Sequence, residues 1–174
     1  MRGRIPDKLT DFRVYNDAQD LLGVADIDLP DFEADSDEIK GAGLAGVLDT
    51  PALGQFKSLQ VGLNFRTPTD ATFTLLAPKV HKLSLYGSIQ HFDGVAGEIK
   101  EIPCKIYVHG LPKKKSMGKF DSGKKTETKL ELELTYIKIS LDGEDKLELD
   151  KLNYIFMVDG KDYLAAVRVN LGLA

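Results

Sequence analysis

The segment Lys129-Leu-Glu-Leu-Glu-Leu-Thr-Tyr136-Ile-Lys-Ile-Ser-Leu-Asp-Gly143 decides the fold class. Apolar and polar side chains alternate up to Tyr136, and the alternation then continues one residue out of phase. A period of two is typical of a strand with one buried face, and a slip of one residue is what a β-bulge produces. Asp-Gly is a favoured pair for a two-residue type I′ turn. The segment therefore predicts a long strand, bulged near Tyr136, that enters a tight hairpin.

Further strands are predicted where short alternating runs are bounded by Gly, Pro, Asn or Asp. These runs are residues 13–15, 21–29, 58–65, 81–90 and 99–109. Roughly seven strands need two packed layers or a closed barrel. A short helix is expected over Asp70–Ala77, between a Thr-Pro-Thr start signal and Pro78. The turn at Asp159-Gly160 leads into Tyr163–Arg168, whose pattern fits a strand and a short helix equally well.

The predicted fold class is mainly β: an antiparallel β-sandwich or half-barrel with one short α-helix and long loops. The 174 residues, 43% of them hydrophobic and 29% charged, are enough for one domain over residues 1–174. A formal charge of −4 argues against a dedicated nucleic-acid binder, because neutralising phosphates needs a basic face. The first residues lack an apolar signal segment, and no stretch approaches the length of a membrane span, so neither export nor membrane anchoring is expected.

Charge is segregated along the chain. Residues 1–50 hold 5 Lys and Arg against 12 Asp and Glu. An acidic and then glycine-rich loop is expected at 31–54, and a lysine-rich loop at 111–126. The basic loop holds only Phe120 as an aromatic residue, so base readout is unsupported. The two loops are either solvated or make complementary contacts between copies of the chain, which would favour head-to-tail association.

The sequence offers no supported cofactor, metal or catalytic site. Gly41-Ala-Gly-Leu-Ala-Gly46 matches a dinucleotide-binding pattern, but it follows an acidic stretch instead of a buried strand and opens no helix. The alternating acids from Asp31 fail as a calcium loop, because the sixth residue is Ser36 and the twelfth is Ala42. The single Cys104 falls on an apolar phase, and the histidines are scattered. We expect no cofactor and no enzymatic activity.

Several segments together resemble a known family. They are the opening strand and turn 12–17, Leu29-Pro30, the loop Ile39-Lys-Gly-Ala-Gly43, the hairpin 136–143 and the ending 162–173. In order and spacing they resemble the major tail tube proteins of contractile-tailed bacteriophages and phage-tail-like bacteriocins, or tailocins. The resemblance covers nearly the whole chain and is least evident over 113–125.

The resemblance implies a structural protein that polymerises as stacked hexameric rings into a hollow tube with a continuous inner β-barrel. DNA, or ions in a bacteriocin, would pass through the tube into the target cell after sheath contraction, without specific binding. It also implies sheath, tape-measure and baseplate proteins as partners. The location implied is the virion tail or tailocin particle, with synthesis and assembly in the cytoplasm of the bacterial host.

Four strands are expected to line the channel, at residues 20–29, 58–66, 99–109 and 126–136. Their polar phase would face the channel, and their apolar phase would fill the subunit core. The expected channel-lining residues are Asp26, Asp28, Ser58, Gln60, Asn64, Arg66, Lys105, Glu131, Glu133 and Thr135. The expected core residues are Leu59, Val61, Leu63, Cys104, Ile106, Leu130, Leu132 and Leu134. The expected residues of contacts between subunits or rings are Asp31, Asp35, Asp37, Gly41, Gly43, Gly46, Lys113, Lys114 and Lys115.

Two other classes of protein stay open alongside the phage-type tube. A type VI secretion tube would share the ring architecture. A β-sandwich module that binds carbohydrate or protein would need an exposed aromatic platform, yet the chain has no Trp and its long loops offer only Phe32, Phe56 and Phe120. An enzyme ranks last, because nothing places a nucleophile beside a base.

Replacing Gly41 or Gly43 by Ala or Val is expected to block polymerisation while leaving the fold intact, because both glycines are expected at close contacts between copies. Electron microscopy would follow polymerisation and circular dichroism would follow the fold. A soluble Gly43→Val variant that still forms filaments would contradict this expectation.

Overall fold

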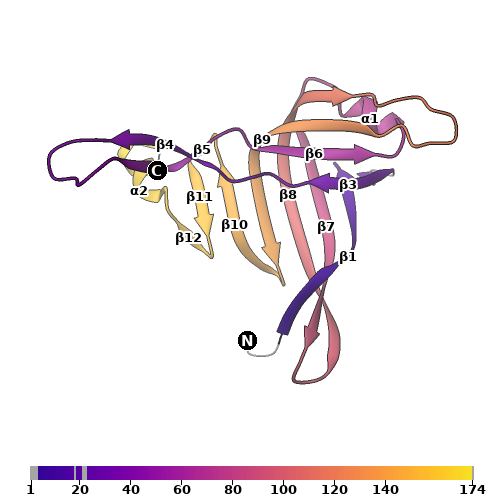
Figure 1. Cartoon of the computed structure of the whole chain (residues 1–174), viewed down its shortest axis with the longest axis horizontal. Helices are drawn as coiled ribbons and strands as arrows, with labels where there is room; N and C mark the ends of the chain where they lie inside the picture. The colour runs from indigo at the N-terminus through magenta and orange to yellow at the C-terminus, as the bar shows by residue number, and fades with distance from the viewer. Residues whose placement is uncertain (1–3, 18, 21–22, 174) are drawn as a thin grey trace.

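The computed structural model describes residues 4–17, 19–20 and 23–173, and consists mainly of antiparallel strands (Figure 1). Two short helices are α1 (Asp70–Thr74) and α2 (Ala165–Asn170). The first strands are β1 (Arg4–Asn16), β2 (Gln19–Asp20), β3 (Val24–Asp28), β4 (Ala34–Ile39), β5 (Leu48–Phe56) and β6 (Gln60–Phe65). They are followed by β7 (His81–Asp93), β8 (Glu98–Ser116), β9 (Thr128–Leu141), β10 (Glu144–Asp150), β11 (Ile155–Val158) and β12 (Lys161–Asp162).

Strands β8 and β9 run through two layers of one sheet. Residues 98–110 of β8 and 136–141 of β9 lie in the large layer, whose strand order is β12-β11-β10-β9-β8-β7-β1-β2. Beyond Gly110, β8 leaves β7 and pairs only with the first half of β9, which also pairs with β6. Strand β3 pairs with β6, which completes a four-stranded layer in the order β3-β6-β9-β8. The two layers pack over one core, and the sheet does not close into a barrel.

The sheet bends where β8 and β9 pass between the layers. His109 is opposite Tyr136 while Gly110 is opposite Leu134, so Thr135 is an extra residue in β9. This confirms the predicted bulge near Tyr136. A Cβ at Gly110 would lie 3.0 Å from the Cβ of Leu132 and 3.1 Å from the backbone oxygen of Glu133. The bend therefore depends on an extra residue in one strand and on the missing side chain in the other.

The predicted core is confirmed in all but one position. Leu59, Val61, Leu63, Ile106, Leu130, Leu132 and Leu134 are buried, together with residues of β1, β7 and β10 such as Val14, Leu83 and Leu149. Cys104 is only half-buried and packs at the margin of this core. The turn after β9 is confirmed as well, because Asp142 and Gly143 both have positive φ, at 53° and 83°.

Several element boundaries differ from the sequence prediction. The described residues contain twelve strands instead of about seven, since strands were extended or divided by turns. Strand β1 continues far beyond 13–15, because it pairs along nearly the whole of β7. Helix α1 stops at Thr74, before the expected end at Ala77. Residues 165–170 form a helix, one of the two alternatives left open, so the described residues hold two helices instead of one. The expected strand over 21–29 begins at Val24, and residues 21–22 lie outside the described ones.

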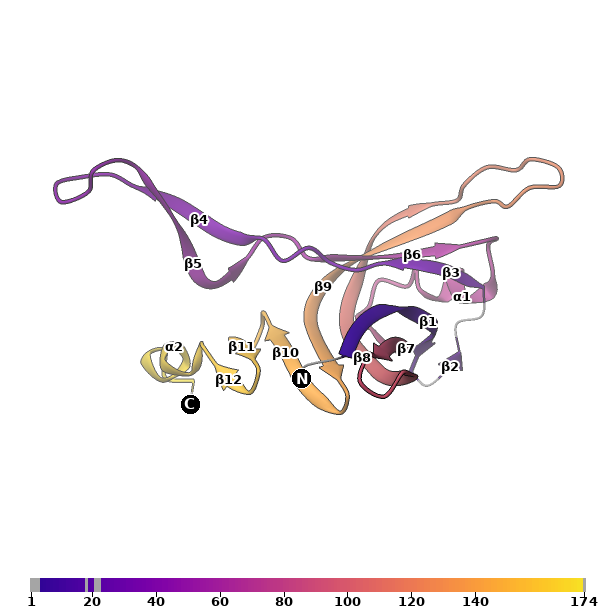
Figure 2. The same ribbon diagram turned by 60° about the horizontal axis from the view of Figure 1, so that its bottom comes forward.

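Both expected long loops contain strands. Residues 34–56 form the hairpin β4–β5, which projects from the body and is called the arm below (Figures 1 and 2). Residues 111–116 are the end of β8, so the irregular connection to β9 is only residues 117–127. This lysine-rich segment forms a strand because its backbone pairs with that of β9.

Replacing Gly110 by Val is expected to lower the free energy of unfolding by about 1–3 kcal/mol, because the new side chain overlaps fixed atoms of β9. Urea unfolding measures this change. Ser116→Val, at an exposed position of the same strand, is the control and is expected to change stability by less than about 0.5 kcal/mol. Equal stability of the two variants would contradict the proposed role of Gly110.

Candidate functional site

The four-stranded layer carries a continuous polar face on the side away from the core. Three successive rows cross it, defined by the pairs Gln60–Glu133, Gly62–Glu131 and Asn64–Lys129. Strand β3 adds Asp28 beside Gly62 and Asp26 beside Asn64, and β8 adds Lys114 beside Glu131. The intervening residues, such as Leu63 and Leu130, fill the core. This alternation gives the layer one dry side and one wet side.

One network on the polar face joins β3, β6 and β9. The Lys129 Nζ lies 2.8 Å from the Asp28 Oδ2, and the Asn64 amide donates to both Asp26 and Asp28. The hydrogen bond from Lys129, followed by the one from Asn64, holds the pKa of Asp28 below its ordinary value. Asp28, Gln60, Gly62, Lys129 and Glu131 also line a polar groove of about 330 Å³. The face is therefore hydrophilic and hollowed, with its acids partly neutralised.

A second network centres on Glu133. Its Oε2 accepts a hydrogen bond from the Ser58 hydroxyl at 2.5 Å and lies 3.3 Å from the Lys113 Nζ. The Lys151 Nζ lies 3.7 Å from the other carboxylate oxygen. Burial acts to raise the pKa of Glu133. The hydrogen bonds from Ser58 and Lys113 and the nearby lysine charges lower it by more, so the pKa of Glu133 lies below its ordinary value.

Most of the predicted channel-lining residues lie together, and three do not. The polar face unites Asp26, Asp28, Ser58, Gln60, Asn64, Glu131 and Glu133. Lys105 is on the other layer, opposite Ser140 and Tyr86, because β8 joins the four-stranded layer only after Gly110. Arg66 follows the end of β6, and Thr135 sits in the bulge, where its hydroxyl donates to the His109 oxygen at 3.3 Å. Alternation grouped these side chains on one face of a sheet but could not identify which strands are neighbours.

The structure separates Lys113, Lys114 and Lys115. A register shift between Pro112 and Lys114 leaves Lys113 free to reach Glu133 on the polar face, while Lys114 lies opposite Glu131. Lys115 turns to the other side, where its Nζ lies 4.1 Å from the centre of the Phe73 ring. Partial burial lowers the pKa of Lys115. Two of these lysines thus join the polar face, which the sequence analysis did not predict.

The arm and the tip of the β8–β9 hairpin project in opposite directions (Figure 2). Asp31, Asp35 and Asp37 and the glycines at 41, 43 and 46 are all exposed. The arm holds four acids against Lys40 and is acidic, whereas the opposite tip, residues 117–127, holds three lysines against Asp121 and Glu127 and is weakly basic. The two loops expected to meet between copies cannot meet within one chain.

An aromatic cluster, missed by the sequence analysis, holds the root of the arm. Phe56 packs against Phe32 and against Phe156, with ring centres 6.0 and 5.0 Å apart, and Phe156 packs against Tyr163. Phe56 is therefore engaged within this cluster, and Phe32 packs edge-on against it, so these two rings hold the arm instead of forming a separate flat platform. The apolar spacing within 154–163 could have indicated a packed cluster, but it does not show that these residues contact Phe56.

The described ranges contain no group of three His, Cys, Asp or Glu side chains placed to hold a metal ion. They also contain no helix long and apolar enough to cross a membrane.

A sequence comparison decides the family. The model of the phage tail tube protein FII family matches residues 6–172, nearly the whole chain. The chain belongs to this family. It is also 28% identical over 179 residues to the tail tube protein of Escherichia phage P2, covering 97% of this chain and 99% of the relative.

Solved structures agree with the fold of this tail tube protein. The sheath/tube terminator of the extracellular contractile injection system PVC, in its extended state, superimposes with a TM-score of 0.55 at 14% identity. The match covers 78% of this chain and 97% of that one. The extended sheath–tube complex of the same system gives a TM-score of 0.52 over 74% of this chain and 87% of that one, also at 14% identity. These structures confirm the predicted mainly β fold class, and the family model confirms the resemblance to phage tail tube proteins.

Replacing Glu133 by Gln is expected to remove a pH-dependent contribution to the stability of the tail tube protein. Because the pKa of folded Glu133 lies below its ordinary value of 4.5, the ionised form stabilises the fold above that pH, and this contribution is lost as the pH falls through the lower folded-state pKa. The free energy of unfolding should be higher for the wild type at neutral pH, and the difference should narrow in acid.

Urea unfolding at a series of pH values measures this difference. Glu98→Gln, at the exposed start of β8, is the matched control and should change the free energy of unfolding at neutral pH by less than about 0.5 kcal/mol. A difference between the wild type and Glu133→Gln that stays constant down to about pH 3 would contradict the role given to the Glu133 network.

Proposed function

We propose that this tail tube protein polymerises as stacked hexameric rings whose four-stranded layers join into one continuous inner barrel. The observation that carries the proposal is the pair of open edges on that layer. Among the described residues, β3 pairs only with β6, and residues 111–116 of β8 pair only with β9. Open strand edges of this kind are normally covered or paired. A second copy can cover each of them.

The direction of the strands suits such closure. All neighbours in the order β3-β6-β9-β8 are antiparallel, so β3 and β8 of one layer run in opposite directions. When β8 of one copy lies beside β3 of the next, the new pair is antiparallel as well. The pattern can therefore continue around a ring with no change in strand direction, and a closed barrel leaves no edge.

The polar face is proposed as the lining of the channel. Its four carboxylates are largely neutralised by Lys113, Lys114 and Lys129, two of which make ion pairs. A lining with no strong basic patch offers little to grip phosphates, which favours passage of DNA without specific binding. Ions would pass the same channel in a DNA-free particle.

The same proposal assigns the other roles. The acidic arm and the basic β8–β9 tip would meet between copies, because they lie at opposite ends of one chain and carry opposite charge. The sheath, tape-measure and baseplate proteins are proposed partners, and the role is structural and not catalytic. Assembly in the host cytoplasm before incorporation in the virion tail or tailocin belongs to this proposal.

Electron microscopy of the purified protein over a range of concentration and salt tests the assembly. Hollow tubes or rings with hexameric end views are expected. A chain that stays monomeric even with a tube or baseplate fragment as nucleus would contradict the proposal.

Amide hydrogen exchange of the assembled and dissociated protein then tests which edges meet. Peptides covering 24–28 and 111–116 are expected to gain protection in the tube, because their outer amides find partners there. Residues 93–98, at the β7–β8 turn, are the internal control and should exchange equally in both states. Tubes without added protection at the two edges would contradict the edge-to-edge barrel while leaving polymerisation itself in place.

A further inference from the structure

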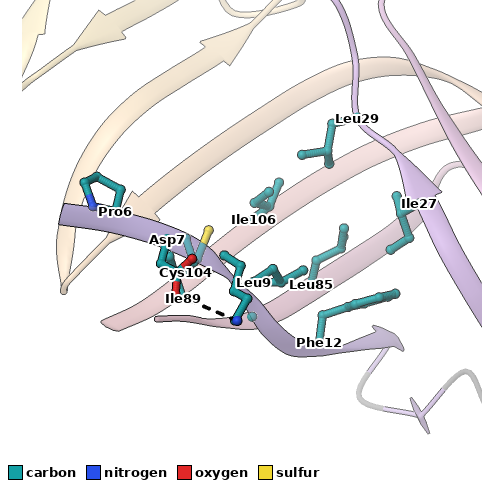
Figure 3. A pocket seen from close by; sticks show the side chains of 12 residues that line it. Pro6, Asp7, Leu9, Phe12, Ile27, Leu29, Leu85, Ile89, Cys104 and Ile106 are labelled. Atoms are coloured by element: carbon teal, nitrogen blue, oxygen red, sulfur yellow. Dashed lines mark ion pairs between the residues drawn. The ribbon is translucent and has the colours of Figure 1, made fainter. Parts of the chain in front are cut away.

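An apolar pocket of about 370 Å³ opens beside the free edge of β3 (Figure 3). Strand β1 forms one wall and the end of β3 forms the other, over a floor of β7 and β8. The side chains that define it are Leu9, Phe12, Ile27, Leu29, Leu85 and Ile106. Leu9 and Leu29 are each 52% exposed, so the core reaches solvent here. A set of apolar side chains left open in this way marks a contact site.

The tip of the arm has the matching chemistry. Residues 41–48 carry no charged side chain, although the arm around them is acidic. Leu44, Val47 and Leu48 are 42, 60 and 52% exposed, respectively. A Cβ at Gly41, Gly43 or Gly46 would meet no atom within 4 Å, so the tip touches little of its own chain. Burying this tip would desolvate no charge.

We propose that the arm tip of one copy docks in the apolar pocket of a second copy. The arm of the same chain does not reach the pocket, because it leaves the body just beyond Leu29, at the pocket rim, and runs away from it (Figure 1). The arm tip and the pocket are thus different surfaces of the same chain. A contact of this kind is head-to-tail, and it closes into rings or propagates along a filament.

Charged groups stand only at the margins of the two surfaces. Asp7 and Lys8 form an ion pair of 3.9 Å at the pocket. Lys40, which pairs with Glu38 at 2.8 Å, and Asp49 flank the charge-free tip, one on each side. An apolar centre with charged groups confined to its rim is the usual anatomy of an interface core.

The inference rests on the proposed function and deepens it, because it assigns a partner surface to the charge-free tip of the arm, while the acidic residues of the arm outside the tip remain available to the basic β8–β9 tip. The pocket also adjoins β3, the edge proposed to pair with the next copy, so docking would extend that interface.

Cys104, the single cysteine of the chain, lines the pocket and reports on its occupancy. Labelling of wild-type Cys104 by a maleimide is expected to be roughly tenfold slower in assembled tubes than in the dissociated chain, because a docked tip covers the thiol. Equal rates in tubes and free chain would overturn the docking while leaving tube formation intact. Absence of any assembly would contradict the proposed function, and the docking with it.

An engineered cross-link identifies the segment that covers the pocket. Leu44→Cys is expected to form a disulfide between copies in oxidised tubes, giving dimers and longer ladders on non-reducing gels. The ladder should vanish when Cys104→Ser is added. Phe120→Cys, 90% exposed at the opposite tip, is the matched control and should give no link that depends on Cys104.

Val47→Cys provides a second probe on the same tip if Leu44→Cys does not assemble. Protection of Cys104 with no cross-link from either tip variant would mean that another segment fills the pocket, and would overturn the proposal.

Discussion

The subunit depends on the passage of β8 and β9 from one layer to the other. Before the bulge, the buried residues of β9 occupy even positions such as Leu132 and Leu134, and after it Ile137 is buried. The extra residue at Thr135 restores the apolar phase to the inside after the sheet has turned. Without that shift, one half of β9 would present its apolar side chains to water. The separation of a dry core from a wet face therefore follows from one change of register.

The same bend creates the unfinished parts of the molecule. Because β8 leaves β7 at Gly110, residues 111–116 gain a free edge, and β3 forms the other edge of the small layer. The layer is then a strip of antiparallel strands with two open sides and a pocket beside β3. Such features are costly in a monomer and useful in a polymer. The polar face can remain wet in either state, since its acids are held by lysines of β8 and β9.

The sequence predicted what depends on local pattern. The alternation around Leu130 and Leu132, the bulge near Tyr136 and the turn at Asp142-Gly143 all follow from side-chain period and turn chemistry. Lys105 was placed beside the wrong strands, because a period of two assigns a face but no neighbour. The strand at 111–116 escaped prediction, since its lysines do not alternate and its pairing comes from β9. Long-range contacts, and not local preference, decide these parts.

The arm shows how such contacts tie distant segments together. A Cβ at Gly54 would lie 2.6 Å from a methyl group of Leu164, so the arm root and the start of α2 are in close contact. Helix α2 is in turn held by Arg168, which lies 2.6 Å from Asp162 and donates to the Tyr154 oxygen at 2.8 Å. Together with the Phe56–Phe156 contact, these bonds hold the root of the arm against the last strands and α2. The exposed tip can thus be presented in a defined direction although it has few contacts of its own, which suits a segment whose partner is another copy.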